Sequence, residues 1–182
     1  IREFINGKRV QHFKPFSLVL VLAGAYGFLY LYFKIDDVPR IDGKHELDQM
    51  MAKSNELMAA NYSIAELILI PFFSLGSFIV FKKSGYNYVQ HLVINLFLSA
   101  QRLVVTILLF PVTYIYSNSS KGTGTIIGLL AAAILFMWTF IQLFNHQPKF
   151  KTGLKAAWAF VFSFIMISVV SMIGGFIAML LK

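Results

Sequence analysis

The amino-acid sequence predicts an all-α, polytopic integral membrane helical bundle of about five transmembrane helices, with one amphipathic surface helix. Two observations carry this prediction. The 182 residues are 58% hydrophobic and only 13% charged, whereas a soluble domain has about 45–50% apolar and about 25% charged residues. The apolar residues also gather in blocks of about 18 or more residues that are almost free of charge, which is typical of helices that cross a bilayer.

A basic arm, residues 1–15, precedes the first apolar block and contains Lys8, Arg9 and Lys14. A net charge of +8 raises the question of nucleic-acid binding. However, Lys and Arg flank the apolar blocks and form no separate basic face. Basic residues in such places mark cytoplasmic loops near anionic lipid. We therefore predict a cytoplasmic juxtamembrane arm and no nucleic-acid partner.

Five apolar blocks make up the membrane domain, residues 16–182, and each is predicted to cross the membrane. The second block stops at Lys82 and Lys83. The third is longer than one crossing needs, because no strong breaker precedes Pro111; we expect a strong tilt, or first turns that lie at the interface. The predicted spans are residues 16–33, 64–81, 92–116, 126–144 and 157–181.

The polar loop between the first two spans, residues 35–62, holds six of the eight acidic residues. Leu47, Met50 and Met51 recur there at helical spacing, which predicts an amphipathic helix on the membrane surface or across the end of the bundle. A methionine-rich face that binds a partner is the alternative. The contrast in Lys and Arg between the short loops predicts that the N-terminus is cytoplasmic and that this acidic loop is outside.

Polar residues on the third apolar block follow one side of a helix. Asn87, His91, Asn95, Ser99 and Arg102 are separated by steps of four, four, four and three residues. A cation near the centre of a spanning helix is costly. Arg102 is therefore expected to face the bundle interior, water or a partner chain.

Glu66 is the only carboxylate inside a predicted span, so it is the obvious partner for Arg102. Side chains lean towards the N-terminus of their helix, which points Glu66 outward and Arg102 inward. This divergence disfavours a direct pair, although it leaves one open. We expect Arg102 to tether helices, and a substrate or lipid-headgroup site is the alternative.

The remaining polar groups predict structural hydrogen bonds. His91, Asn95 and Gln101 suit contacts between helices, and a proton relay or metal ligand at His91 is the alternative. The chain has no cysteine, and no H-x-x-x-H or carboxylate cluster accompanies His91. We therefore predict no metal, cofactor or catalytic residue. The intramembrane polar candidates are Glu66, His91, Asn95, Ser99, Gln101 and Arg102, and the candidate lipid-headgroup contacts are Lys8, Arg9, Lys14, Lys82 and Lys83.

The run INGKRVQHFKPFSLVLVLAG resembles the start of an uncharacterised bacterial multi-pass membrane family, a domain of unknown function. That family shows an N-G-K-R arm, a K-P pair before the first span and an N-Y-x-x-H-L segment, matched here at residues 87–92. Members usually carry a zinc-ribbon-like segment before the arm, so we expect that further residues precede Ile1. The resemblance implies topology and a bacterial inner membrane, and it implies no mechanism.

Three classes of function are compatible with these features. We favour a non-catalytic accessory or assembly subunit that packs against lipids and other membrane protein subunits. The alternative is a small transporter, channel or lipid-handling protein that uses the polar residues of the third span. An intramembrane enzyme is disfavoured, because only lone polar residues are available to it.

Overall fold

The computed structural model describes residues 14–33, 53–54, 57, 60–119 and 123–180, and all regular structure in them is helical. Five of its helices are long and apolar enough to cross a membrane. The predicted fold class is therefore confirmed: the chain is a multi-pass membrane protein by length and composition of its helices. The helices are α2 (Pro15–Tyr32), α4 (Tyr62–Val80), α5 (Tyr88–Leu108), α6 (Phe110–Ser119), α7 (Thr123–Leu143) and α8 (Lys149–Leu180), with a short 3₁₀ helix η1 (Lys82–Ser84).

The third span differs from its prediction, residues 92–116. Helix α5 begins at Tyr88, where Asn87 and Gln90 form a capping box: each side chain bonds the other's backbone N–H, at 2.9 and 2.8 Å. The helix ends at Leu108, and the separate helix α6 follows. Proline lacks a backbone N–H and clashes with the preceding turn, so Pro111 lies in the first turn of the new helix α6 and does not extend α5. The 21 residues of α5 span about 32 Å, close to one bilayer core.

The fifth span also differs, because α8 begins at Lys149 and not near residue 157. No proline follows Pro148, and the hydroxyl of Thr152 donates to the Pro148 carbonyl at 3.1 Å. The first turns of α8 therefore carry residues that the sequence assigned to a loop. Most of the arm (residues 1–15) and of the predicted surface helix (residues 35–62) lies outside the described residues.

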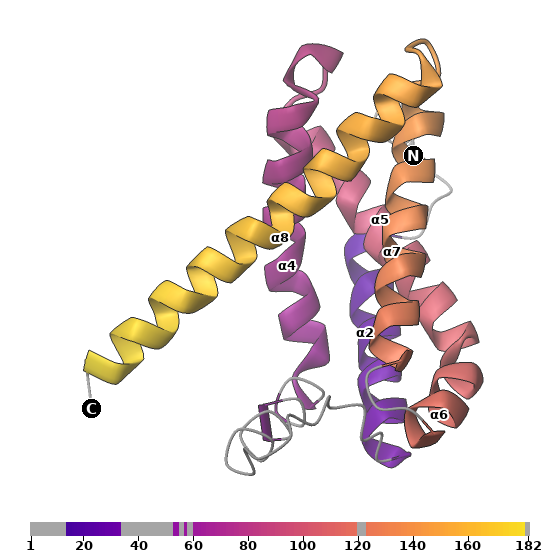
Figure 1. The fold of residues 1–182 in the computed structure, drawn as a ribbon, viewed down its shortest axis with the longest axis vertical. Coiled ribbons are helices and arrows are strands. Elements are labelled where there is room, and N and C mark those ends of the chain that lie inside the picture. Colours follow the sequence, from indigo (N-terminus) through magenta and orange to yellow (C-terminus); the bar gives the residue numbers. More distant parts are fainter. Residues whose placement is uncertain (1–13, 34–52, 55–56, 58–59, 120–122, 181–182) are drawn as a thin grey trace.

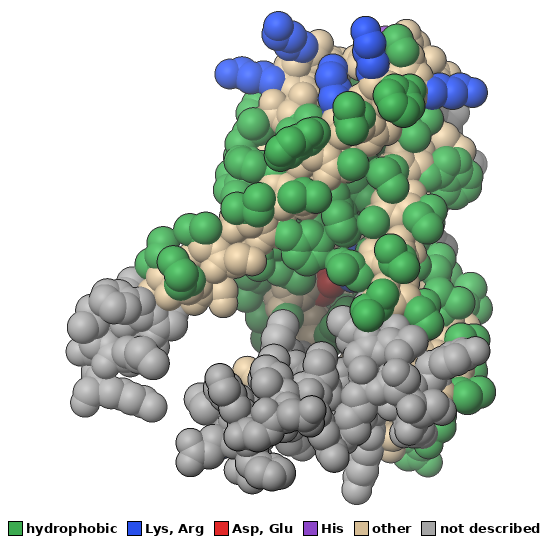
Figure 2. All heavy atoms as spheres, viewed as in Figure 1, with side chains coloured by type: hydrophobic (Ala, Val, Ile, Leu, Met, Phe, Trp, Pro, Cys, Tyr) green, Lys and Arg blue, Asp and Glu red, His purple; other side chains and the backbone are tan. Residues whose placement is uncertain are grey.

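Helices α4, α5, α7 and α8 pack around the interior of the bundle, with contacts from α4 to α5 and α8, and from α7 to α5 and α8 (Figure 1). Helix α2 packs against α4 and α5, and α6 packs against α7. Lysine side chains gather at one end of the bundle, where η1 and the start of α8 lie (Figure 2). The exposed lysines of these elements are Lys82, Lys83, Lys149, Lys151 and Lys155.

The bundle is tightly packed near this lysine-rich end. Phe81, Phe140 and Phe144 are fully buried, and the Phe81 ring lies 4.9 Å from each of the other two. Helices α4 and α8 approach closely at Gly76, where an added Cβ would overlap the hydroxyl of Ser163 and lie 3.1 Å from the Ala159 carbonyl oxygen. A larger residue at this crossing would need Ser163 and the backbone at Ala159 to move.

Candidate functional site

The polar residues predicted on one side of α5 divide into two groups in the structure. The first group consists of His91 and Asn95 of α5 together with Ser77 of α4, which hydrogen-bonds both of them. We call this group the tether. Arg102 belongs to the second group and faces Glu66 of α4. Helices α4 and α5 are antiparallel and joined by a short connection, so residues equally far from that connection lie side by side. The tether is close to the connection and the ion pair is further from it, so the two groups lie at different depths.

The tether is a buried hydrogen-bonded cluster between α4 and α5. The amide of Asn95 donates to the Ser77 hydroxyl oxygen at 3.1 Å and to the His91 carbonyl at 2.8 Å. His91 Nδ1 and Ser77 Oγ lie 3.0 Å apart. All three side chains are at most 2% exposed. Hydrogen bonds at this depth hold two helices in one register, because breaking them would leave polar groups in hydrocarbon.

Aromatic rings enclose His91. Phe78 and Tyr86 meet the imidazole edge-on, and Phe140 lies parallel to it at 6.4 Å. Among the described residues, Nε2 of His91 has no hydrogen-bond partner, and no group of three His, Cys, Asp or Glu side chains could hold a metal ion. This setting gives His91 a packing role within the tether and keeps it away from the cavity described below.

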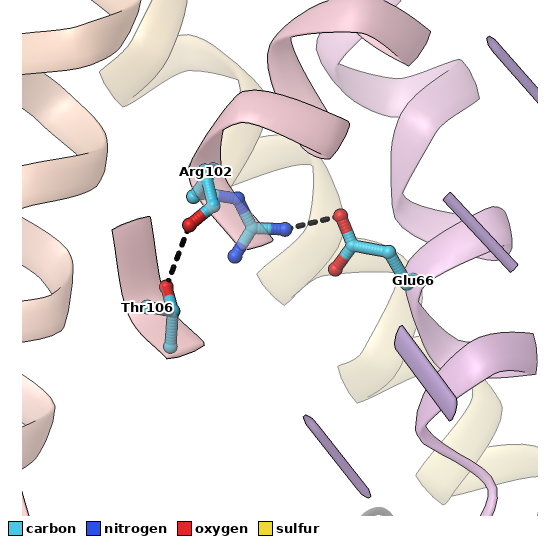
Figure 3. Close-up of polar contacts among 3 residues, drawn as sticks. All are labelled: Glu66, Arg102 and Thr106. Carbon is cyan, nitrogen blue, oxygen red and sulfur yellow. Dashed lines mark hydrogen bonds and ion pairs between the residues drawn. The ribbon is translucent and has the colours of Figure 1, made fainter. Parts of the chain in front are cut away.

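Arg102 and Glu66 form an ion pair between α5 and α4, with Nη2 of Arg102 donating to Oε1 of Glu66 (Figure 3). One turn further along α5, the hydroxyl of Thr106 donates to the Arg102 carbonyl at 2.9 Å. The expected divergence of the two side chains is therefore wrong. Because α5 ends at Leu108, Arg102 lies nearer the end of its helix than the predicted span implied, and so at the depth of Glu66 near the start of α4.

A cavity of about 370 Å³ lies beside this ion pair. Its walls come from α2, α4, α5, α6, α7 and α8, and on α4, α5 and α7 most of them come from the half of the helix that is further from the lysine-rich end, with Phe73, Asn95 and Phe136 just past the middle. Aromatic and aliphatic side chains form most of the wall, and Asn95, Ser99 and Arg102 supply a polar strip. The other lining residues are Tyr26, Tyr30, Tyr62, Leu69, Phe73, Leu98, Thr106, Thr113, Gly128, Leu129, Ala132, Phe136, Phe160, Phe164 and Ile167.

The two members of the ion pair differ in their access to the cavity. The Arg102 side chain is 28% exposed, whereas that of Glu66 is 2% exposed, and Glu66 is not among the lining residues. Tyr62, which lines the cavity, lies near both charges. The cavity is therefore bordered by Arg102 and not by the carboxylate that balances it.

The other predicted residues lie apart from this site. Gln101 is exposed on α5, and Lys14, Lys82 and Lys83 are exposed at helix ends, while Lys8 and Arg9 lie outside the described residues. Contact of the three described lysines with lipid headgroups stays a prediction.

Sequence reasoning missed two contributors to these groups. Thr106 continues the polar steps of α5 by four residues beyond Arg102, so a longer search of the same helix face would have found it. Ser77 follows Ser74 by one turn in an apolar span, and both serine hydroxyls bond carbonyls of α4, at 3.1 and 2.7 Å. A pair of serines at this spacing is a weak signal, because serine often bonds its own helix.

Comparison of the chain with protein families, with curated proteins and with solved structures gives no match. The resemblance to a bacterial membrane family therefore stays a prediction, and the geometry of the cavity and the ion pair is the basis for assigning a function.

Proposed function

We propose that this multi-pass membrane protein binds an amphipathic small molecule in the cavity beside Arg102, as a lipid-handling or transport protein does. One observation carries the proposal: the cavity reaches Asn95, Ser99 and Arg102 in the interior of the bundle. Its volume of about 370 Å³ falls within the range of about 300–1,000 Å³ that is typical of ligand sites.

The wall chemistry supports an amphipathic ligand. Phe73, Phe136 and Phe164 belong to one apolar side, while the polar strip of α5 borders the other. Ligand sites in proteins combine such apolar walls with a few polar groups that orient the ligand. A fully polar solute would leave most of this wall without a favourable contact.

The cavity favours this function over the accessory subunit that the sequence suggested. An accessory subunit packs through its lipid-facing surface, and this does not call for a hollow interior. Protein interiors are normally filled to the density of organic crystals, and the other half of this bundle is packed in that way around Phe81, Phe140 and Phe144. A space beside a charged side chain is then better explained by a ligand.

We further propose that binding proceeds without covalent chemistry. His91 bonds Ser77 and is not a lining residue, and Arg102 is held by Glu66. General acid–base catalysis most often uses His, Asp or Glu within reach of the substrate, and none of these is among the described residues that line the cavity.

The orientation proposed from the sequence has the lysine-rich end in the cytoplasm. The exposed lysines of η1 and α8 support this orientation, because cytoplasmic loops carry the excess of Lys and Arg. Most of the cavity then lies in the outer half of the membrane. A bacterial inner membrane is the location that the family resemblance implies.

Photo-crosslinking tests the proposed function. The protein, reconstituted in lipid nanodiscs, is irradiated with a long-chain alcohol that carries a diazirine, and the modified residues are mapped by mass spectrometry. We expect labels on cavity-lining residues that are not exposed on the outer surface, such as Leu98 and Ala132. Gly128→Phe should abolish them, because space at Gly128 is open and a phenyl ring there fills the cavity.

Leu130→Phe is the matched control, since it adds the same ring to the exposed side of α7 and should leave the cavity labels intact. Labels confined to exposed residues such as Leu130 and Ile134, with no change in Gly128→Phe, would contradict the proposed function.

A further inference from the structure

We propose that the cavity selects amphiphiles with an anionic headgroup, a carboxylate or a phosphate, and that Arg102 binds this headgroup while the apolar chain lies along the aromatic wall. This inference rests on the proposed function and adds the chemical class of the ligand. It also gives Glu66 a role, as a counter-charge with which the ligand competes.

The unequal exposure of the two charges is the first argument. A guanidinium has five N–H donors in a planar fork, and Arg102 uses Nη2 towards Glu66 and also hydrogen-bonds the side chain of Tyr62. The side chain of Arg102 is 28% exposed and lines the cavity, whereas Glu66 is 2% exposed and does not. A ligand in the cavity therefore meets the positive end of the pair.

The charges around the cavity give the second argument. Among the described residues, Glu66 is the only acidic one. Within this part of the chain, anion binding at Arg102 is opposed by the carboxylate of Glu66 alone, which does not line the cavity. Hydrogen bonds between arginine and carboxylate or phosphate are stronger than neutral ones and are often bidentate, so a second anion can use donors that Glu66 leaves unused.

The aromatic part of the cavity wall gives the third argument. Phe73, Phe160 and Phe164 form one aromatic cluster, with ring centroids 4.9–5.8 Å apart. This surface suits an alkyl chain and offers no partner for a second charge. A single anionic headgroup on one apolar chain matches both sides of the cavity.

Competition between ligand and Glu66 makes a prediction that a purely structural ion pair does not make. Glu66→Gln keeps the shape of the side chain and removes its charge, so Arg102 becomes more available to an anion. Binding of an anionic amphiphile should then become tighter. If the pair only held the helices together, loosening it would weaken binding or leave it unchanged.

Competition against the diazirine alcohol tests the inference. Dodecanoate, dodecyl phosphate and dodecanol share one chain length, and each is titrated against crosslinking at the cavity in wild-type protein. We expect the anions to compete about tenfold better than dodecanol, as a charge-assisted hydrogen bond implies. The ratio of the two anions then shows whether a carboxylate or a phosphate is preferred.

Glu66→Gln should improve competition by both anions several-fold and leave dodecanol unchanged. Glu66→Gln with Arg102→Gln, which keeps the interior free of net charge, should remove the anion preference. Lys155→Gln is the control for anions drawn to the lysine-rich surface, and it should change nothing.

The outcomes separate the two proposals. Equal competition by all three compounds in wild-type protein, or an anion preference that Lys155→Gln removes and Glu66→Gln does not raise, would overturn the inference and keep the proposed function. Absence of cavity labelling in wild-type protein would overturn the proposed function itself.

Discussion

Two levels of the helix pair α4–α5 use polar residues in opposite ways. At the tether, Ser77, His91 and Asn95 are at most 2% exposed and bond one another, and three aromatic rings surround His91. Two turns further along α5, Arg102 is 28% exposed and borders a cavity of about 370 Å³. The polar groups of the tether bond one another and hold the helices together, whereas Arg102 has N–H donors that can bind a ligand in the cavity.

This difference shows that spacing on one helix does not assign a role to a polar residue. His91, Asn95, Ser99 and Arg102 share one side of α5, yet their surroundings come from different parts of α4, α7 and α8. Close contact at Gly76 brings α8 against α4 beside the tether, whereas Gly128 of α7 has open space at the cavity. The neighbouring helices decide which polar residue is structural.

The largest difference in the free energy of unfolding is expected between two phenylalanine replacements, one beside the tether and one beside the cavity. Phe140→Ala empties a fully buried position next to the tether and should lower the free energy of unfolding by about 3–5 kcal/mol. Phe164→Ala removes a ring that is 39% exposed and already borders the cavity, so the loss should be about 1 kcal/mol. Unfolding by SDS in mixed micelles measures both. Equal losses would contradict the contrast in packing.

The ion pair should show the next largest effect. Arg102→Leu leaves the carboxylate of Glu66, which is 2% exposed, without its partner, and should cost about 3 kcal/mol. Glu66→Leu with Arg102→Leu removes both charges and should recover most of that loss. The same SDS titration compares the single and double variants. A double variant as unstable as Arg102→Leu would show that an uncompensated charge is not the cause.

The smallest change in the free energy of unfolding is expected when either of two glycines is replaced by alanine. One replacement should destabilise the protein and the other should stabilise it. Gly76→Ala places a Cβ on the Ser163 hydroxyl and should destabilise by about 1–3 kcal/mol. Gly128→Ala adds a Cβ where nothing lies within 4 Å and should stabilise by about 0.5–1 kcal/mol through helix propensity. Thermal unfolding of the two variants beside wild-type protein measures the signs, and a shared sign would contradict the assignment of the two environments.

The sequence predicted the number of spans because the hydropathy of a helix depends only on the residues of that helix. It misplaced the ends of α5 and α8, because Pro111 and Pro148 decide where those helices end and begin. The ion pair could have been predicted from the short connection between α4 and α5. Glu66 and Arg102 lie 18 residues before and after Ser84, and Ser77 and His91 lie seven residues before and after it, so an antiparallel hairpin brings each pair to one depth.

The cavity could not be predicted in the same way. Its far wall comes from α7 and α8, through residues such as Ala132 and Phe164 that are ordinary in any spanning helix. Whether such residues fill the space beside Arg102 depends on the distance and angle between helices, which side-chain packing sets and which no spacing in one sequence encodes.

Native mass spectrometry tests the central claim most directly, namely that the tether holds the helices and the cavity binds an amphiphile. The protein is released from nanodiscs with dodecanoate present, as wild type, as Ser77→Ala and as Gly128→Phe. Ser77→Ala removes an acceptor from the tether and should lower stability while keeping one bound amphiphile, as in wild type. Gly128→Phe should keep stability and lose the bound amphiphile. Equal occupancy in Gly128→Phe and wild type would contradict the account.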